Sequence, residues 1–410
     1  MGLFSREPKP HVTYEVEVKH KKLRMVLIVI LLAIGVVAIT SGIMALLNTD
    51  PGWQEVTANA QEQSVGGNFI FQYYFSNAGA SATELNQKVS AVYDEATVKA
   101  YWLFTPDEES AEYKNIWYIN HHPGEAIAVD PVLYQAFEKL QGSRYLYLGP
   151  AYAEYNSLCF NPDDAQVFAA DPAVNAENRA YVQKIAAFAA DPDAIHLELL
   201  GNNTVKLTVS EEYLAFAREY EIDCFLDFHY MTNAFVIDYL AQSLMEQELT
   251  QGYLVSVDGY TRNLWQGGDL FKMNLFDLDG TTIYPAATFG YRGPMNIVSL
   301  RDFPIAASNA YYRVGAQQRV LHPYLSLQTG MPMASTHAVV ALSEKMGCAD
   351  MLLQLLPVYI AETLDETALR TADFDCIWFQ NTDICYTDKD LTFTDLFTDT
   401  LRTYKPELKK

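Results

Sequence analysis

The sequence lacks the short motifs by which many enzyme classes are recognised. It contains no G-x-S-x-G, H-E-x-x-H, G-x-x-x-x-G-K-[ST] or G-x-G-x-x-G segment and no C-x-x-C pair. These segments are close to obligatory for their chemistries on the common folds, because each supplies a nucleophile, a metal ligand or a phosphate cradle in fixed geometry. Their absence excludes most hydrolase, kinase and zinc-enzyme interpretations.

Cysteine is scarce and unpaired in spacing. The chain has 5 cysteines, an odd number without zinc-like spacing: Cys159, Cys224, Cys348, Cys376 and Cys385. A disulfide framework is therefore not predicted. Cys376 and Cys385 could pair if their strands are neighbours, but we expect five free thiols.

Charge is low in amount and one-sided in sign. Charged residues make up 19% of the chain against 50% hydrophobic and 13% aromatic residues, which predicts a globular protein rather than a disordered one. After residue 47 the chain carries 22 Lys/Arg and 48 Asp/Glu, a net charge of −26. Such a surface repels phosphate backbones, so we expect no nucleic-acid partner. Basic or metal-bridged partners remain open, as does a merely solubilising role for the charge.

One long hydrophobic run stands near the N-terminus. Met25–Leu47 has no charged residue in 23 positions, enough at about 1.5 Å per residue to cross a bilayer core of about 30 Å. Lysine and arginine crowd residues 19–24, which places residues 1–24 in the cytoplasm and the domain outside. A cleaved signal peptide is the alternative, but its apolar core is usually only about 7–15 residues. We therefore predict a single-pass anchor in the cell membrane, of a kind found in a bacterial envelope.

The rest of the chain reads as one domain. Residues 48–66, with Pro51, Gly52 and Gly66, predict a tether; residues 67–390 predict the domain; residues 391–410 predict an acidic tail. Helical patterns occupy 82–93, 130–140, 175–190 and 211–220. Strand patterns occupy 68–74, 196–209, 253–257, 271–276, 281–284, 296–300 and 338–342, with turns at 201–203 and 279–280. Irregularly mixed helices and strands predict an α+β fold.

Several segments resemble, in order, those of a known family. Residues 227–238 read DFHYMTNAFVID, 253–260 read YLVSVDGY, 305–313 read IAASNAYYR, and 322–332 read HPYLSLQTGMP. Asn115 to Asn120, the turn at Gly124 and Cys348-Ala349-Asp350 extend the likeness to roughly residues 68–360. The set is similar to the FAD:protein FMN transferases (ApbE-like proteins, once called thiamine-biosynthesis lipoproteins), whose first segment reads D-L-G-G-x-A-K-G-x-x-x-D.

The resemblance implies a flavin-transferase-like domain that transfers FMN from FAD, with Mg²⁺, to a Thr or Ser of an envelope protein. It assigns His322 to catalysis, and it assigns the metal to Asp350, the backbone carbonyl of Thr232, and Gln354. The residues that it places around the flavin nucleotide are Asp227, His229, Asn233, Asp258, Gly259, Ser308, Thr329 and Gly330.

The same comparison reveals departures. His229 and Tyr230 replace two family glycines, which let the backbone approach a nucleotide closely. Asn233 replaces a lysine, which removes a positive charge that could face phosphate. Pro323 stands at the second histidine of the family pair, and leaves His322 one position away.

These departures keep other interpretations open. An inactive descendant that acts as a ligand-binding or protein-interaction module is one, and an unrelated sensor ectodomain is another. Asp227 and Asp238 can equally be structural, and Asp350 can be a helix cap. His121-His122 fits a solvated loop better than a metal pair, because adjacent side chains diverge.

Overall fold

The computed structural model describes residues 51–58, 63–76, 80–160, 164–280, 282–305, 311–400 and 402–409. Gly52–Phe75 and the chain from Asn86 onward form one compact unit, and the start of helix α2 up to Leu85 falls outside it. The predicted membrane anchor at 25–47 and the segment before it lie outside the described residues. Of the helices that are described, none is long and apolar enough to cross a membrane.

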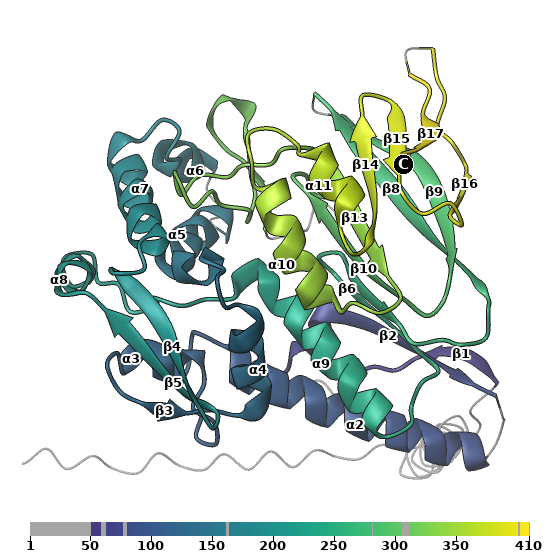
Figure 1. Cartoon of the computed structure of the whole chain (residues 1–410), viewed down its shortest axis with the longest axis horizontal. Coiled ribbons are helices and arrows are strands. Elements are labelled where there is room, and N and C mark those ends of the chain that lie inside the picture. Colours follow the sequence, from purple (N-terminus) through teal and green to yellow (C-terminus); the bar gives the residue numbers. More distant parts are fainter. Residues whose placement is uncertain are drawn as a thin grey trace, which may run out of the picture. The chain divides into compact units, whose positions relative to one another are not determined.

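A nine-stranded sheet forms the centre of this unit (Figure 1). All neighbouring strands are antiparallel except the last pair, β15 and β17. In spatial order the strands are β1 (Gly52–Glu55), β2 (Phe69–Phe75), β6 (Gly252–Ser256), β7 (Tyr260–Asn263), β10 (Met295–Arg301), β13 (Ala338–Ser343), β14 (Asp375–Gln380), β15 (Asp383–Tyr386) and β17 (Lys405–Leu408).

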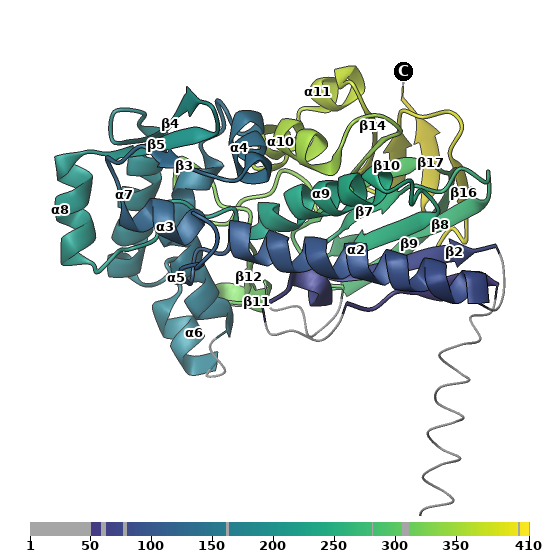
Figure 2. The same cartoon turned by 90° about the horizontal axis from the view of Figure 1, so that it is seen from below.

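Three long helices cover one face of this sheet: α2 (Ala80–Phe104), α9 (Thr232–Glu246) and α10 (Cys348–Tyr359). The alternation in β2 explains the packing, because Phe71 is buried and its ring lies 4.8 Å from that of Tyr93 in α2. Figure 2 shows α2 and α9 running alongside each other on this side. We call it the helical face.

A second sheet covers part of the opposite face, which we call the outer face. It consists of β16 (Thr392–Thr394), β9 (Thr282–Arg292) and β8 (Leu270–Asp279). Phe289 and Leu275 pack here against Ile297 and Leu342 of the large sheet. Strand β10 is therefore covered on both sides, and all its residues except Arg301 are buried.

A smaller helical region precedes α9 in the chain. Its helices are α3 (Ile116–His121), α4 (Pro131–Lys139), α5 (Gly149–Phe160), α6 (Asp164–Ala170), α7 (Ala176–Ala190) and α8 (Glu211–Glu219), around a sheet of β3 (Ile127–Ala128), β5 (Thr204–Val209) and β4 (Ile195–Gly201). The remaining elements are short: β11 (Arg313–Val314), β12 (Val320–Leu321), α11 (Glu366–Thr371), and the 3-10 turns η1 (Val65–Asn68), η2 (Tyr145–Leu148), η3 (His229–Met231) and η4 (Ala316–Gln318).

The predicted α+β class is confirmed, and local signals located several elements well. Asp130 caps α4 by accepting the Val132 N–H at 2.8 Å. Asn202 and Asn203 have φ of 47° and 56°, as a two-residue hairpin turn between β4 and β5 requires. Helices α5, α9 and α10 were not among the helices predicted from the sequence.

Two segments differ from expectation. Gly52–Glu55, within the predicted tether, forms β1 and pairs with β2. The predicted acidic tail supplies β16 and β17, which join different sheets. Each of these three strands depends on pairing with another strand, which its own sequence does not reveal. All five cysteines are free; Cys376 and Cys385 lie on neighbouring strands without a disulfide.

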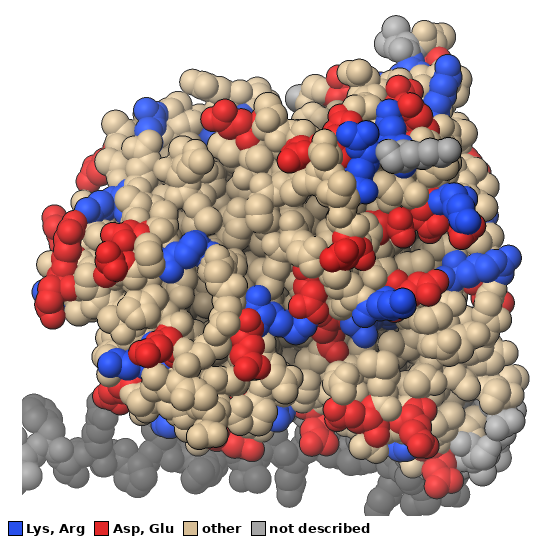
Figure 3. Space-filling model, in the orientation of Figure 1, with Lys and Arg blue, Asp and Glu red and all other residues tan. Residues whose placement is uncertain are grey.

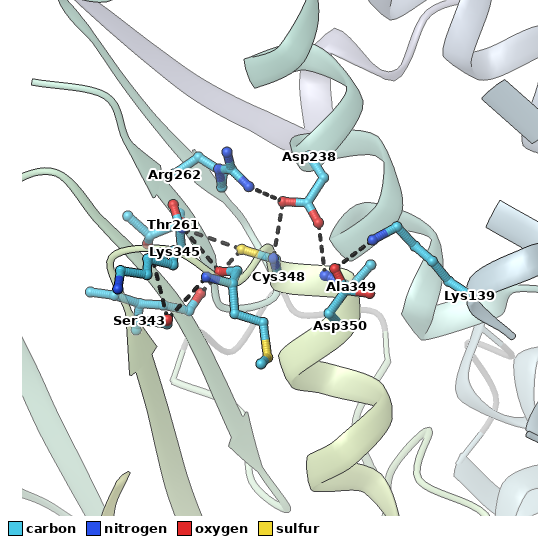
Figure 4. A network of polar contacts seen from close by, with 12 residues as sticks. Lys139, Asp238, Thr261, Arg262, Ser343, Lys345, Cys348, Ala349 and Asp350 are labelled. Atoms are coloured by element: carbon cyan, nitrogen blue, oxygen red, sulfur yellow. Dashed lines mark hydrogen bonds and ion pairs between the residues drawn. The ribbon is translucent and has the colours of Figure 1, made fainter. Parts of the chain in front are cut away.

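Asp238 joins three elements on the helical face. From α9, its Oδ1 accepts the Cys348 N–H and its Oδ2 accepts the Ala349 N–H, both at 2.9 Å, at the start of α10. Arg262 of β7 donates to Oδ1 at 2.6 Å. Figure 4 shows this carboxylate pointing at the first turn of α10 with Arg262 beside it. It therefore acts as a helix cap and an ion-pair partner at once.

We expect Asp238→Ala to lower the free energy of unfolding by about 3 kcal/mol, because it removes the cap and leaves the Arg262 charge without its partner. Urea denaturation measures the change. Asp350→Ala, three residues into the same helix, is the matched control; its ion pair is more exposed, and we expect a loss under about 1 kcal/mol. Equal losses would contradict the role given to Asp238.

Candidate functional site

Asn120 holds the segment that leads into α9. Its buried side-chain oxygen accepts the N–H groups of Phe225 at 3.0 Å and Leu226 at 2.8 Å. Its amide nitrogen donates to the Leu226 carbonyl at 2.9 Å. These three bonds satisfy a buried stretch of backbone that belongs to no sheet, and they fix the position of Asp227 beyond it.

Asp227 and His229 form a tight turn in front of α9. The Asp227 Oδ1 accepts the His229 N–H at 2.7 Å. His229 has φ of +47°, a left-handed conformation that favours glycine. The backbone therefore has a conformation typical of glycine although the residue is a histidine. Burial raises the pKa of Asp227 to about 7, which makes this carboxyl a weak acid compared with an exposed one.

The His229 ring fills the space beside this turn. It stacks on Tyr152 with ring centroids 4.5 Å apart, and its Nε2 lies 2.8 Å from the Asn156 Oδ1. Burial lowers the pKa of His229 to about 3, so the ring is neutral near pH 7. Since Oδ1 only accepts, the network assigns the proton to Nε2 and leaves Nδ1 without a partner.

Asn233 and Asp258 meet one turn further on. Asn233, the second residue of α9, donates to the Asp258 Oδ2 at 3.0 Å and accepts from the Asn68 amide at 3.3 Å. The Ser256 hydroxyl donates to the Asp258 Oδ1 at 2.5 Å. Burial raises the pKa of Asp258 to about 6, although these hydrogen bonds favour its charged form.

Gly259 completes this turn because no other residue fits. Its φ is +113°, and a Cβ would lie 2.5 Å from the Ser299 carbonyl oxygen. We call Asp227, His229, Asn233 and Asp258 the α9 cluster. The structure therefore brings together, around the start of one helix, five of the eight residues predicted to surround a nucleotide.

His322 is separated from the α9 cluster by the rings of Tyr324 and Tyr230. Its ring centroid is 5.6 Å from that of Tyr324, whose ring packs on Tyr230 at 5.0 Å. The side chain is 6% exposed, and Nδ1 has no partner. Burial, helped by Arg319, lowers the pKa of His322 to about 3. It is thus a buried, neutral imidazole beside the ring of Tyr324.

Thr329 and Gly330 belong to a turn that packs against α7. The Gly330 N–H donates to the Ser326 carbonyl at 2.8 Å, and Thr329 accepts the Met331 N–H at 3.3 Å. A Cβ at Gly330, whose φ is +66°, would lie 2.3 Å from the Val182 carbonyl oxygen. Close packing on α7 accounts for this glycine. Ser308 lies outside the described residues.

A cavity of about 740 Å³ lies between α2, α4, α9, β7 and the start of α10. We call it the α10 cleft. Its cations are Lys99, Lys139 and Arg262, and its acids are Glu95, Asp238, Glu246 and Asp350. Basic and acidic side chains lie next to each other over this part of the surface (Figure 3). The cleft has the size of a small-molecule site, with charges that largely neutralise one another.

Each cation of the α10 cleft already has an acidic partner. Lys139 of α4 reaches the Asp350 Oδ2 at 2.5 Å, as Figure 4 shows, and Arg262 pairs with Asp238. Lys99 pairs with Asp130 at 2.8 Å. The Lys139–Asp350 pair is more than a third exposed on both sides, so it contributes under about 1 kcal/mol and can be opened by a ligand.

The predicted metal ligands do not form the site that Mg²⁺ prefers, with six oxygens of which one or two belong to carboxylates. The Asp350 carboxylate faces the Lys139 ammonium. Gln354 is exposed and donates to the Met346 sulfur at 3.5 Å, while Thr232 begins α9 and donates its N–H to the His229 carbonyl. Across the described ranges, no three His, Cys, Asp or Glu side chains converge as metal ligands do. This donor set does not fit Mg²⁺ while Lys139 holds the carboxylate.

His121 and His122 diverge as expected. His121 stacks on Trp117 and His122 on Tyr118, with ring centroids 3.8 and 3.9 Å apart. Each Nδ1 lies 2.8 Å from a backbone carbonyl four residues earlier. They close the end of α3, and each ring packs on a different aromatic side chain.

Sequence reasoning did not single out Lys139, Arg262, Tyr152 or Asn156. They come from α4, β7 and α5, far in the chain from the residues that they contact. No motif contains them, and only the packing of these elements against α9 and α10 brings them to the site.

Asp227→Asn is expected to gain stability over the natural protein as the pH rises. In the natural protein, folding raises the pKa of Asp227 from 3.8 to about 7. The stabilisation that comes from the protonated carboxyl is therefore fully present below pH 3.8 and is lost as the pH rises to about 7. The amide still accepts the His229 N–H and does not titrate. The difference in free energy of unfolding should grow by about 2 kcal/mol or more between pH 4 and 8 in urea titrations. Asp223→Asn, which removes an exposed carboxylate from the same loop, is the matched control.

His229→Gly is expected to be more stable than His229→Ala by about 1 kcal/mol, because alanine must adopt the left-handed conformation that glycine reaches freely. Both variants lose the same stacking and hydrogen bond, so thermal or urea unfolding isolates the backbone. An alanine variant of equal or higher stability would show that this turn is not left-handed.

Comparison with solved structures places this architecture. The flavin transferase ApbE of Vibrio cholerae superposes with a TM-score of 0.52 at 12% identity, over 84% of this chain and 98% of its own. The ApbE protein of Thermotoga maritima gives 0.51 at 13%, over 84% and 97%. No family model and no curated protein matches the chain by sequence. The resemblance read from the segments is confirmed in the tertiary structure: this chain has the fold of the ApbE flavin transferases.

Proposed function

We propose that this protein binds a flavin nucleotide, FAD, on the flavin-transferase fold and works outside the membrane that anchors it. The observation that carries the proposal is the shared fold along nearly the whole length of the solved flavin transferase. A cavity of about 740 Å³ at α9 and α10, beside residues of the resembling segments, supports it.

Transfer of FMN to an envelope protein is the reaction to expect on this fold. A Thr or Ser hydroxyl oxygen of the acceptor would form a bond to the FMN phosphorus, the pyrophosphate bond of FAD would break, and AMP would leave with the electron pair. The hydroxyl proton needs an acceptor. The neutral His322 and the Asp227 carboxyl, whose pKa is about 7, are the candidates in this chain.

The location is part of the proposal. The uncharged run at 25–47, with Lys and Arg before it, supports a single-pass anchor with the N-terminus in the cytoplasm. The acidic domain would then meet its acceptor in a bacterial envelope. FAD in that compartment is a substrate or ligand that the cell must supply.

A second candidate is binding without transfer, as expected of an inactive descendant. Two observations favour it. Lys139 holds the carboxylate that the resemblance assigns to Mg²⁺, and the His229 ring occupies the place of a glycine beside the turn. This candidate keeps the fold and the cleft as a ligand-binding or protein-interaction module.

Titration calorimetry of FAD into the full chain in detergent tests both. We expect binding whose dissociation constant changes less than about twofold on adding Mg²⁺, because Lys139 already supplies a cation at Asp350. Lys139→Ala frees the carboxylate, and its FAD affinity should become Mg²⁺-dependent. An acceptor peptide with a Thr, followed by mass spectrometry for added FMN, then separates transfer from binding alone.

Lys99→Ala is the matched control, because it removes another cation of the same cleft that pairs with Asp130 instead. It should leave the response to Mg²⁺ as in the natural protein. Strict Mg²⁺ dependence of the natural protein would show that the metal displaces Lys139 and would favour transfer. Absence of any FAD binding would refute the flavin proposal.

A further inference from the structure

We propose that the outer face of the large sheet, at its β1 edge, rests on the interface of the lipid bilayer. The inference rests on the proposed membrane anchor but not on flavin binding. The docking face consists of Trp53, Ile70, Tyr74, Val257, Trp265 and Leu270.

Strand alternation directs Trp53, Ile70 and Tyr74 to the outer face. Trp53 in β1 lies opposite Tyr74 in β2, and Ile70 lies opposite Val255 in β6. The buried residues of β2 point to the helical face, so Ile70 and Tyr74 point away from it. The second sheet covers only part of the outer face, and its first residue, Leu270, borders the uncovered part.

The docking face is apolar and exposed where it is uncovered. Val257 is 57% exposed, Ile70 49%, Leu270 48% and Trp53 36%. The rings of Trp53, Tyr74 and Trp265 form a cluster on this face, with centroids 4.8 to 5.6 Å apart. Tryptophan and tyrosine rings with aliphatic neighbours are typical of the membrane–water interface, where one end of the ring is apolar and the other is wet.

The short connection between the anchor and β1 indicates that the docking face contacts lipid. Only Asn48, Thr49, Asp50 and Pro51 separate the apolar run from β1. At roughly 3.5 Å per residue, these residues span no more than about 20 Å, even fully extended. Trp53, the second residue of β1, must therefore stay close to the surface of any bilayer that the run crosses. A short tether and an aromatic face at its end commit the proposal to lipid rather than to a soluble partner.

Charge does not supply the attraction. Glu55 lies opposite Gln72 on the same side as Trp53 and Tyr74, Arg292 lies opposite Leu270, and Asp269 already accepts the Trp265 indole N–H at 2.8 Å. Docking on zwitterionic lipid should therefore depend on the rings and aliphatic side chains, with little response to salt.

The test reconstitutes the full chain into phosphatidylcholine vesicles and compares plain lipid with lipid brominated near the head group, which quenches nearby tryptophan. The chain has 5 tryptophans, and none precedes Trp53, so the anchor is silent. We expect a loss of emission in brominated vesicles that is unchanged by salt. The loss should disappear in Trp53→Phe with Trp265→Phe and persist in Trp102→Phe with Trp117→Phe.

Leu270→Glu provides a second variant that keeps all tryptophans. It should reduce the quenching of Trp53 and Trp265, whereas Leu200→Glu, at a residue 45% exposed on β4, should not. Chain that floats with the vesicles but shows equal emission in both lipids overturns the proposal; if cross-linking then gives a dimer, a second copy covers this face. Chain that does not float refutes the anchor and docking together. A failure to bind FAD leaves this result unchanged.

Discussion

The Asp238 carboxylate is the contact on which both halves of the site depend. It holds the start of α10 against α9 through two N–H groups and ties both helices to the sheet through Arg262. A single carboxylate can do this because the first turn of a helix offers unpaired N–H groups and a partial positive charge. The α9 cluster lies at one end of α9 and the α10 cleft along its side, so their relative position follows from this contact.

Around that contact, burial and ion pairing limit the charge that the site presents. The two histidines are neutral because burial lowers their pKa values, and burial raises those of Asp227 and Asp258. In the α10 cleft each cation faces an acid. A pyrophosphate would have to open at least one of these pairs, and the exposed Lys139–Asp350 pair is the easiest to open. The free-energy cost of admitting such a ligand is therefore mainly that of opening the Lys139–Asp350 ion pair.

The two faces of the large sheet divide the proposed tasks. Helices α2, α9 and α10 and the α10 cleft lie on the helical face, and the docking face lies on the opposite side of the same sheet. A domain that rests on lipid through the docking face would therefore turn the α10 cleft toward the aqueous compartment. That orientation suits an acceptor protein that approaches from outside the membrane.

The sequence by itself determined the local and the colinear features. The α+β class, the cap at Asp130, the hairpin turn at Asn202-Asn203 and the order of the family-like segments follow from residue type and spacing. The tertiary structure alone decided the partners. Lys139 reaches Asp350, Asp238 caps α10, His229 keeps a glycine conformation, and residues 52–55 become a sheet edge. The physical reason is that ion pairs, caps between helices and strand pairing join residues far apart in the chain, and they depend on burial and distance, which no local pattern encodes.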